Sequence, residues 1–112
     1  MKFIVSGVLL LALSNVASAQ VGAKVDTFAV YQRCFDRVAT ELFASSIKQA
    51  DKLEKATRKR CKSEREEAII DEQVRFMLNS TLAANFNRNE MIRSMDLVVA
   101  RPTMKRLGFE GY

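Results

Sequence analysis

The chain has 112 residues, of which 48% are hydrophobic and 28% are charged, and its formal net charge is +5 at pH 7. This length holds one small domain, and the composition is too apolar for an intrinsically disordered chain and too interrupted by charge for a polytopic membrane protein. Histidine is absent, which excludes the active sites that use it as a general base and the zinc sites that use it as a ligand.

The first 19 residues have the layout of a signal peptide. Lys2 gives a basic start, residues 3–13 are mainly apolar, and Ala17-Ser18-Ala19 supplies small side chains before a cleavage site. The apolar stretch is too short for a membrane span, which needs about 20 residues. We predict cleavage after Ala19, no transmembrane span, and a periplasmic or secreted product with a net charge of +4 once Lys2 is removed. An uncleaved anchor is the alternative.

Both cysteines, Cys34 and Cys61, follow the predicted cleavage site. An exported chain meets an oxidising compartment, where thiols are usually paired. We therefore predict an intramolecular disulfide between Cys34 and Cys61, which would stabilise the fold by about 3 kcal/mol in the chain-entropy model. An intermolecular bridge and free thiols are the alternatives.

After a lead at residues 20–26, the chain is expected to be helical. Glycine is absent between Gly22 and Gly108, so the strong chain breakers are missing over most of the mature sequence. Asp26-Thr27 is suited to cap a helix. The apolar residues that follow recur at steps of three and four, which predicts an amphipathic helix over residues 27–44; they are Phe28, Tyr31, Phe35, Val38 and Leu42.

A second, long helix is predicted over residues 51–78. Capping boxes at Ser46 and at Asp51 offer two starts. Two antiparallel helices bridged at residues 34 and 61 should turn near the midpoint of those positions, which favours a loop over residues 45–50 and the start at Asp51. The first half of this helix is rich in charge, whereas the apolar residues between Ala68 and Leu78 predict that the second half belongs to the core.

A final helix is predicted over residues 88–100. An end or bend is expected within residues 79–86, after which Asn87 and Glu90 form a capping box and Pro102 stops the helix. Residues 101–112 would form a C-terminal tail. The predicted fold is all-α: a helical domain at residues 27–100, built as a bundle of three or four helices around a disulfide-stapled antiparallel hairpin.

The densest charged feature is a basic patch of Arg58, Lys59, Arg60 and Lys62. The signal peptide argues against a nuclear or nucleic-acid role, and the interleaved aromatic residues that stack on bases are missing. Carboxylates lie within a turn or two of these residues, so a solvated helical face is the leading interpretation. Binding to an anionic envelope component is the alternative.

Three further patterns bear on chemistry. Glu64, Glu67 and Asp71 lie on one helical face, but carboxylate metal centres in helical bundles add histidines, so we predict no metal site, no cofactor and no catalytic residue. Basic sites at Arg60 and Arg106 would be cleaved in a processed precursor. Asn79-Ser80-Thr81 is a glycosylation acceptor only in a host with that pathway.

Methionines supply a candidate partner groove. Met77, Met91 and Met95 are flexible apolar residues that could line an adaptable surface for a partner helix or a small apolar ligand. Core filling is the commoner use of such residues and is the alternative.

The spacing Tyr31-x-x-Cys34-Phe35, with Ala39 one turn on and Cys61 before Glu64, resembles that of small exported two-cysteine helical proteins of Gram-negative bacteria. The resemblance covers residues 28–68. It implies a periplasmic location, and those proteins have no established activity to transfer.

The sequence as a whole predicts a non-enzymatic interaction or structural protein of the periplasm or extracellular space. Its partner would be a protein or an anionic envelope component rather than a nucleic acid, and the chain itself a monomer or small homo-oligomer. A secreted precursor processed at basic sites and a small-ligand carrier are the alternatives.

Overall fold

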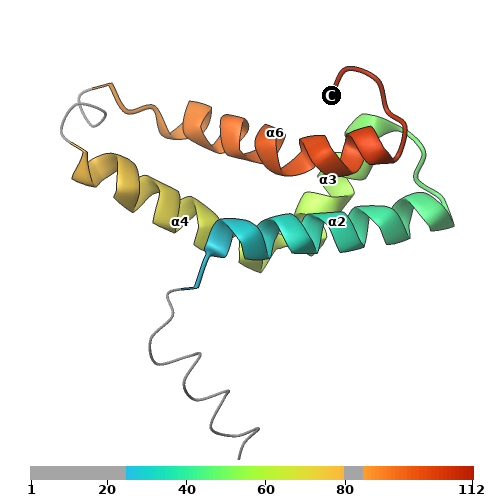
Figure 1. The fold of residues 1–112 in the computed structure, drawn as a ribbon, viewed down its shortest axis with the longest axis horizontal. Helices are drawn as coiled ribbons and strands as arrows, with labels where there is room; N and C mark the ends of the chain where they lie inside the picture. Colours follow the sequence, from blue (N-terminus) through green and yellow to red (C-terminus); the bar gives the residue numbers. More distant parts are fainter. Residues whose placement is uncertain (1–24, 80–84) are drawn as a thin grey trace, which may run out of the picture.

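The computed structural model describes residues 25–79 and 85–112. The predicted signal peptide and most of the N-terminal lead lie outside the described residues. Within them the chain forms four helices and no strand, namely α2 (Thr27–Ser45), α3 (Ala50–Arg60), α4 (Lys62–Leu78) and α6 (Arg88–Arg106) (Figure 1). The all-α bundle with its disulfide is confirmed, because Cys34 on α2 is bonded to Cys61 with 6.0 Å between their Cα atoms.

Helix α2 carries the inner face that the sequence predicted. The Asp26 side chain accepts a hydrogen bond from the Ala29 amide at 3.1 Å, so it caps the first turn. Tyr31 and Phe35 are completely buried, and Val38 is 2% exposed. The remaining predicted stripe residues, Phe28 and Leu42, pack on the same core as partly buried side chains.

The long helix predicted over residues 51–78 is instead two helices, α3 and α4, which meet at Cys61. The backbone there has φ −99° and ψ 29°, outside the α-helical range. Cys61 is completely buried and is held to α2 by the disulfide. The break lets α3 and α4 both pack against α2 while pointing in different directions (Figure 1). Neither predicted capping box is used, because α3 begins after Gln49 without a side-chain cap.

Helix α6 runs beside α2 in the same direction. The contacts that fix this parallel register join Tyr31 with Asp96, Asp36 with Thr103, Thr40 with Arg106, and Phe43 with Phe109. The predicted cap at Asn87 is confirmed, since its side chain accepts from the Glu90 amide at 3.1 Å.

The prediction that Pro102 stops the last helix is wrong, because α6 continues to Arg106. Proline inside a helix costs about 3 kcal/mol through its missing amide and its ring. The turn after Pro102 buries Thr103 and Met104, at 1% and 0% exposure, and Thr103 donates to Asp36 at 2.8 Å. These tertiary contacts outweigh the local cost.

The last residues are packed rather than a loose tail. Gly108, with φ 96°, lets the chain turn back at the end of α6, where the Phe109 amide donates to Met104 and the Gly108 amide to Lys105. The Phe109 ring then meets Phe43 edge to face at 5.6 Å between centroids. The hydroxyl of Tyr112 donates to Glu54 on α3. The C-terminus therefore closes the bundle over the α2–α3 connection.

Candidate interaction surface

The second half of α4 exposes an apolar face to solvent. We call it the α4 outer strip; it consists of Ile70, Val74, Met77 and Leu78, which are 59%, 50%, 54% and 81% exposed. The prediction that this half belongs to the core is wrong for these residues. The helix is apolar on two sides here, and α2 and α6 cover only the side that carries Ala68 and Ile69.

A groove of about 780 Å³ lies beside the outer strip. Three segments form it: the start of α2 with the two residues before it (Val25 to Phe28), the second half of α4, and the first half of α6. Met91 and Met95 line it as largely buried side chains at 7% and 6% exposure. They therefore serve the core and the groove together, so the two interpretations of these methionines are not exclusive.

The third methionine of the candidate groove lies elsewhere. Met77 lines a smaller hollow of about 230 Å³ with Ile70 and Gln73. Val74 and Leu78 line both hollows, so they form a ridge between them. The structure thus brings Met91 and Met95 together and places Met77 across this ridge, and it adds Ile70, Val74 and Leu78 as surface residues that the sequence assigned to the core.

Polar side chains border the groove. The Thr27 hydroxyl donates to the Asp71 carboxylate at 2.7 Å, joining the start of α2 to α4. Arg75 pairs with both oxygens of Glu72, and this hydrogen bonding raises the pKa of the Arg75 guanidinium. Arg75 nevertheless has a side chain that is 73% exposed, so it can reach beyond its own helix.

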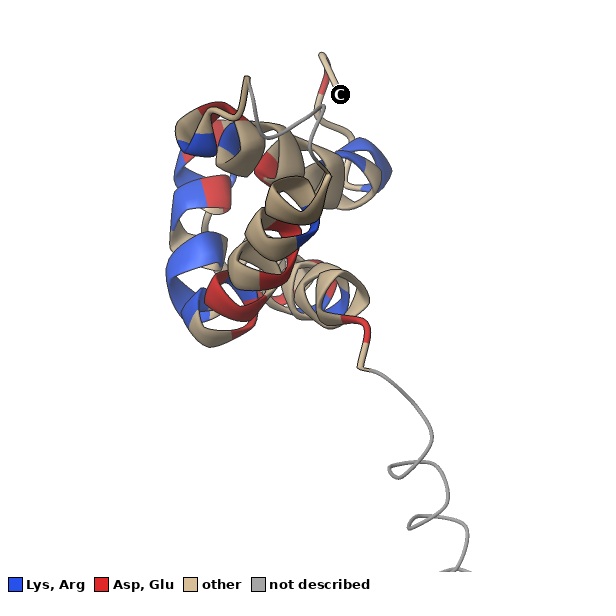
Figure 2. Ribbon diagram, turned by 90° about the vertical axis from the view of Figure 1, so that its left-hand side faces the viewer, with Lys and Arg blue, Asp and Glu red and all other residues tan. Residues whose placement is uncertain are grey.

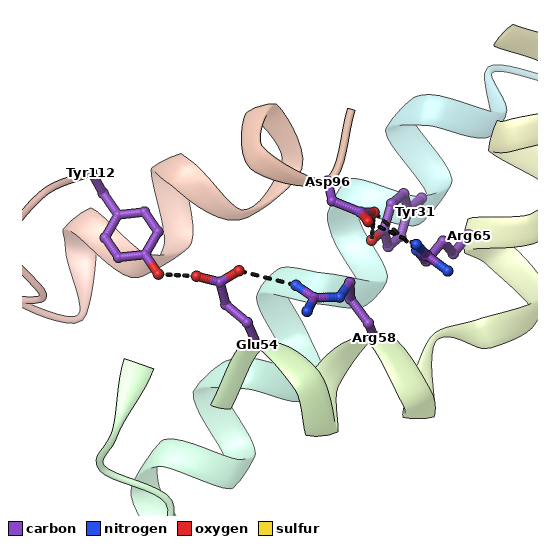
Figure 3. Close-up of polar contacts among 6 residues, drawn as sticks. All are labelled: Tyr31, Glu54, Arg58, Arg65, Asp96 and Tyr112. Carbon is purple, nitrogen blue, oxygen red and sulfur yellow. Dashed lines mark hydrogen bonds and ion pairs between the residues drawn. The ribbon is translucent and has the colours of Figure 1, made fainter. Parts of the chain in front are cut away.

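A polar cluster joins three helices. Arg65 on α4 donates to both oxygens of Asp96 on α6, at 2.9 and 2.8 Å, and the Tyr31 hydroxyl on α2 donates to the same carboxylate at 2.7 Å (Figure 3). Burial first, and then the hydrogen bond to Asp96, raise the pKa of the Tyr31 phenol. The phenol thus stays protonated and keeps donating. The cluster fixes the position of α6 against α2 and α4.

Sequence reasoning missed this cluster. Its one local signal is Asp96 itself, a charge inside the otherwise apolar run from Met95 to Val99. A carboxylate in such a run is usually paired when it faces the interior. The identity of its partners depends on the tertiary packing, because Arg65 and Tyr31 are far away in the sequence.

The predicted basic patch lies where α3 ends and α4 begins. Lys59, Arg60 and Lys62 are exposed, whereas Arg58 is partly buried and pairs with Glu54 at 3.0 Å. Figure 2 shows the Lys and Arg residues of α3 as a blue column down one side of the molecule, interrupted by acidic residues. Positive charge in the last turn of α3 also compensates the negative end of the helix dipole.

The other sequence candidates stay dispersed. Among the described residues no three His, Cys, Asp or Glu side chains are placed to hold a metal ion, and Asp71 is hydrogen-bonded to Thr27. Arg60 and Arg106 each end a helix, and Arg106 pairs with Asp36 at 2.8 Å. Residues 80 and 81 of the glycosylation acceptor lie outside the described residues. No helix in residues 25–79 and 85–112 is long and apolar enough to cross a bilayer.

Comparison with known proteins gives no relative: no protein-family model, curated protein or solved structure matches this chain. The exposed apolar surface is therefore the feature on which a functional interpretation rests.

Proposed function

We propose that this chain is an exported interaction protein without enzymatic activity, which binds another polypeptide through the outer face of α4 and the adjoining groove. The observation that carries the proposal is the contiguity of four half-exposed to mostly exposed apolar side chains with a groove of about 780 Å³. Contiguous apolar surface of this kind on a small protein is typical of an interaction site.

Covalent and polar contacts between the helices hold this surface in a fixed geometry. The Cys34–Cys61 disulfide ties α2 to the α3–α4 junction, and the Asp96 carboxylate ties α6 to α2 and α4. A surface held in a fixed geometry loses less conformational entropy on binding than one that must order itself.

A protein partner is favoured over an anionic envelope component. The outer strip contains no charged side chain, and apolar burial is what such a strip can offer. Helix α3 also carries the carboxylates Asp51 and Glu54, and Arg58 is already paired with Glu54. Binding through α3 would weaken as salt increases because exposed charges are screened, whereas binding through the outer strip would not.

Export is supported by the signal-peptide layout of residues 1–19 and by the disulfide, since disulfides persist in oxidising compartments. We place the protein in the periplasm or outside the cell, which is also what the resemblance to exported two-cysteine helical proteins implies. The precursor alternative is disfavoured because the bond after Arg60 leads to the buried, disulfide-bonded Cys61, and Arg106 pairs with Asp36, so a protease would have to open the packed structure before cutting.

A photocrosslinking experiment in the native cells tests the proposal. The photoreactive residue benzoylphenylalanine would replace Ile70, which is 59% exposed in the strip, and in a matched control would replace Lys55 on the basic helix. We expect irradiation to link the chain to a polypeptide from position 70 and not from position 55. Adducts to lipid or polysaccharide from position 55, with none to protein from position 70, would contradict the proposal.

A further inference from the structure

The outer strip of α4 has a pattern that can complement itself. Ile70, Val74 and Leu78 lie at successive steps of four along one side of the helix, with Met77 beside them. Charged residues lie along one flank of the strip and beyond its N-terminal end. Asp71 and Arg75 follow one flank by helical spacing, whereas the acidic residues Glu66 and Glu67 lie beyond its N-terminal end.

From this pattern we propose that the α4 outer strip is the interface of a homodimer, in which α4 of two copies packs antiparallel about a two-fold axis at Val74. The inference rests on the proposed function and names the docked polypeptide as a second copy of this chain. A two-fold interface uses the same patch twice. Ile70 of each copy then lies against Leu78 of the other, and the two Val74 side chains meet at the axis.

The flanking charges fit this arrangement. A two-fold axis through Val74 brings the same flank of both helices together, so Arg75 lies within two residues of the level of the second copy's Asp71, about 3 Å along the helix axis. The Arg75 side chain is 73% exposed, and the hydrogen bond from Thr27 occupies only Oδ2 of Asp71, so Oδ1 is left to accept from Arg75 of the other copy. Two symmetric ion pairs result, one on each side of the axis.

The acidic residues select the antiparallel orientation. Parallel helices in register would set Glu67, which lies three residues before Ile70 in line with the strip, against Glu67 of the other copy, and like charges across an interface are strongly unfavourable. The antiparallel arrangement carries Glu66 and Glu67 of each copy past the end of the other copy's strip.

The form and size of the strip set the expected strength of the dimer. The ridge of Val74 and Leu78 stands beside a hollow of about 230 Å³ that Ile70 and Met77 also line. In the dimer the two hollows lie on the same side of the two-fold axis, opposite the flank of Asp71 and Arg75, and methionine adapts readily to such a contact. The strip covers only about two helical turns, so the interface lies at the small end of the range and we expect dissociation in the micromolar range.

Sedimentation of the mature, disulfide-bonded chain over a range of concentrations tests the dimer. We expect a reversible shift from monomer to dimer as concentration rises. Because the strip is apolar, this shift should survive high salt. A chain that remains monomeric at all concentrations would overturn the proposal, as would a dimer that salt abolishes.

Two matched variants locate the interface. Val74→Glu places two like charges at the axis, and we expect it to weaken dimerisation at least tenfold. Leu97→Glu changes a side chain of similar exposure, 43% against 50%, on α6 outside the strip, and it should leave dimerisation unchanged. Circular dichroism of both variants checks that the helices form. Equal effects of the two substitutions would contradict this interface.

Two further experiments, a cysteine crosslink and an exchange of charges, test the antiparallel orientation of the two α4 helices. Val74→Cys should form a disulfide-linked dimer on mild oxidation, because the two copies meet there, and Leu97→Cys should not. Arg75→Asp should weaken the dimer because it sets a second carboxylate against Asp71 of the other copy, and adding Asp71→Arg should restore the dimer. A dimer without a link at position 74, or without this rescue, would refute the antiparallel register.

The results also separate this inference from the proposed function. If the pure chain is monomeric but position 70 still links to a different polypeptide in cells, the homodimer is wrong and the interaction role stands. If position 70 links to no polypeptide at all, both are wrong. A linked product of twice the chain's mass is the outcome expected from the homodimer.

Discussion

At the scale of single residues, Asp96 carries the largest share of the polar bonding between helices. It accepts two hydrogen bonds from Arg65 and one from Tyr31, and its side chain is only 14% exposed. Hydrogen bonds to charged groups are stronger than neutral ones, and leaving a charged group unpaired costs more than the bond itself contributes.

The substitution Asp96→Asn is therefore expected to destabilise the fold by about 2 kcal/mol, because it removes the charge while keeping the shape. Urea unfolding followed by circular dichroism measures this difference. Glu72→Gln breaks an ion pair whose arginine is largely exposed, and it should cost less than about 1 kcal/mol. An equal loss in the two variants would mean that Asp96 contributes no more than a surface charge.

Asp36 makes the stability depend on pH in the acid range. Hydrogen bonds from Arg106 and then from Thr103 hold the pKa of its carboxyl below the usual 3.8. The folded chain thus binds a proton less readily than the unfolded one. The contribution of Asp36 is present above about pH 4 and is lost as the pH falls through the lowered pKa of the folded state.

This pH dependence can be measured as the melting temperature of the wild type and of Asp36→Asn between about pH 7 and pH 2. We expect the wild type to melt higher at neutral pH and the difference to shrink as the pH falls below about 4, because the wild-type carboxyl then becomes neutral as well. Glu41→Gln on the same helix controls for the loss of one negative charge. A difference that stays constant over the whole range would be inconsistent with the lowered pKa of Asp36.

At the scale of the helices, where a helix ends and which face it buries depend on whether local or long-range contacts dominate. Helix α2 follows its local pattern, since Asp26 caps it and the predicted stripe faces inward. Helix α6 does not end where its sequence predicts. Its final turn is held by the contact of Thr103 with Asp36 and by the burial of Met104, although Pro102 removes a backbone hydrogen bond.

Replacing Pro102 tests directly whether tertiary contacts hold the last turn of α6 against the local cost of the proline. Pro102→Ala restores the amide that a helix interior uses and removes the steric conflict of the ring, so we expect a gain in unfolding free energy of about 1 to 3 kcal/mol. Chemical unfolding with a linear extrapolation measures it. Arg101→Ala, at the neighbouring exposed position, should change stability by less than about 0.5 kcal/mol. A loss of stability in Pro102→Ala would show that the proline is itself needed at this site.

At the scale of the whole molecule, the disulfide fixes the covalent structure of the domain, and removal of residues 1–19 on export stays a prediction. The structure places Cys34 and Cys61 in one intramolecular bridge. Export would add the oxidising environment in which that bridge forms.

An intact mass of the protein recovered from its exported compartment, with and without reduction, tests both points. We expect one species that begins at Gln20 and gains two hydrogens on reduction. A mass that retains residues 1–19, or one that does not change on reduction, would contradict export with oxidation.

Features that depend on neighbouring residues could be predicted from the amino-acid sequence. The all-helical class, the caps at Asp26 and Asn87, and the inner face of α2 follow from periodicity and capping, whose energies arise within a few positions of each residue. The Cys34–Cys61 pairing also followed, because only two cysteines were present to pair.

Long-range packing, by contrast, set the break at Cys61, the continuation of α6 through Pro102, the bonding of Asp96 to Arg65, and the exposure of the α4 outer strip. Each of these depends on contacts between segments far apart in the chain, whose energies exceed local preferences. The strip is the clearest case. An apolar pattern shows that a helix has faces suited to burial, but which face is covered depends on where α2 and α6 pack.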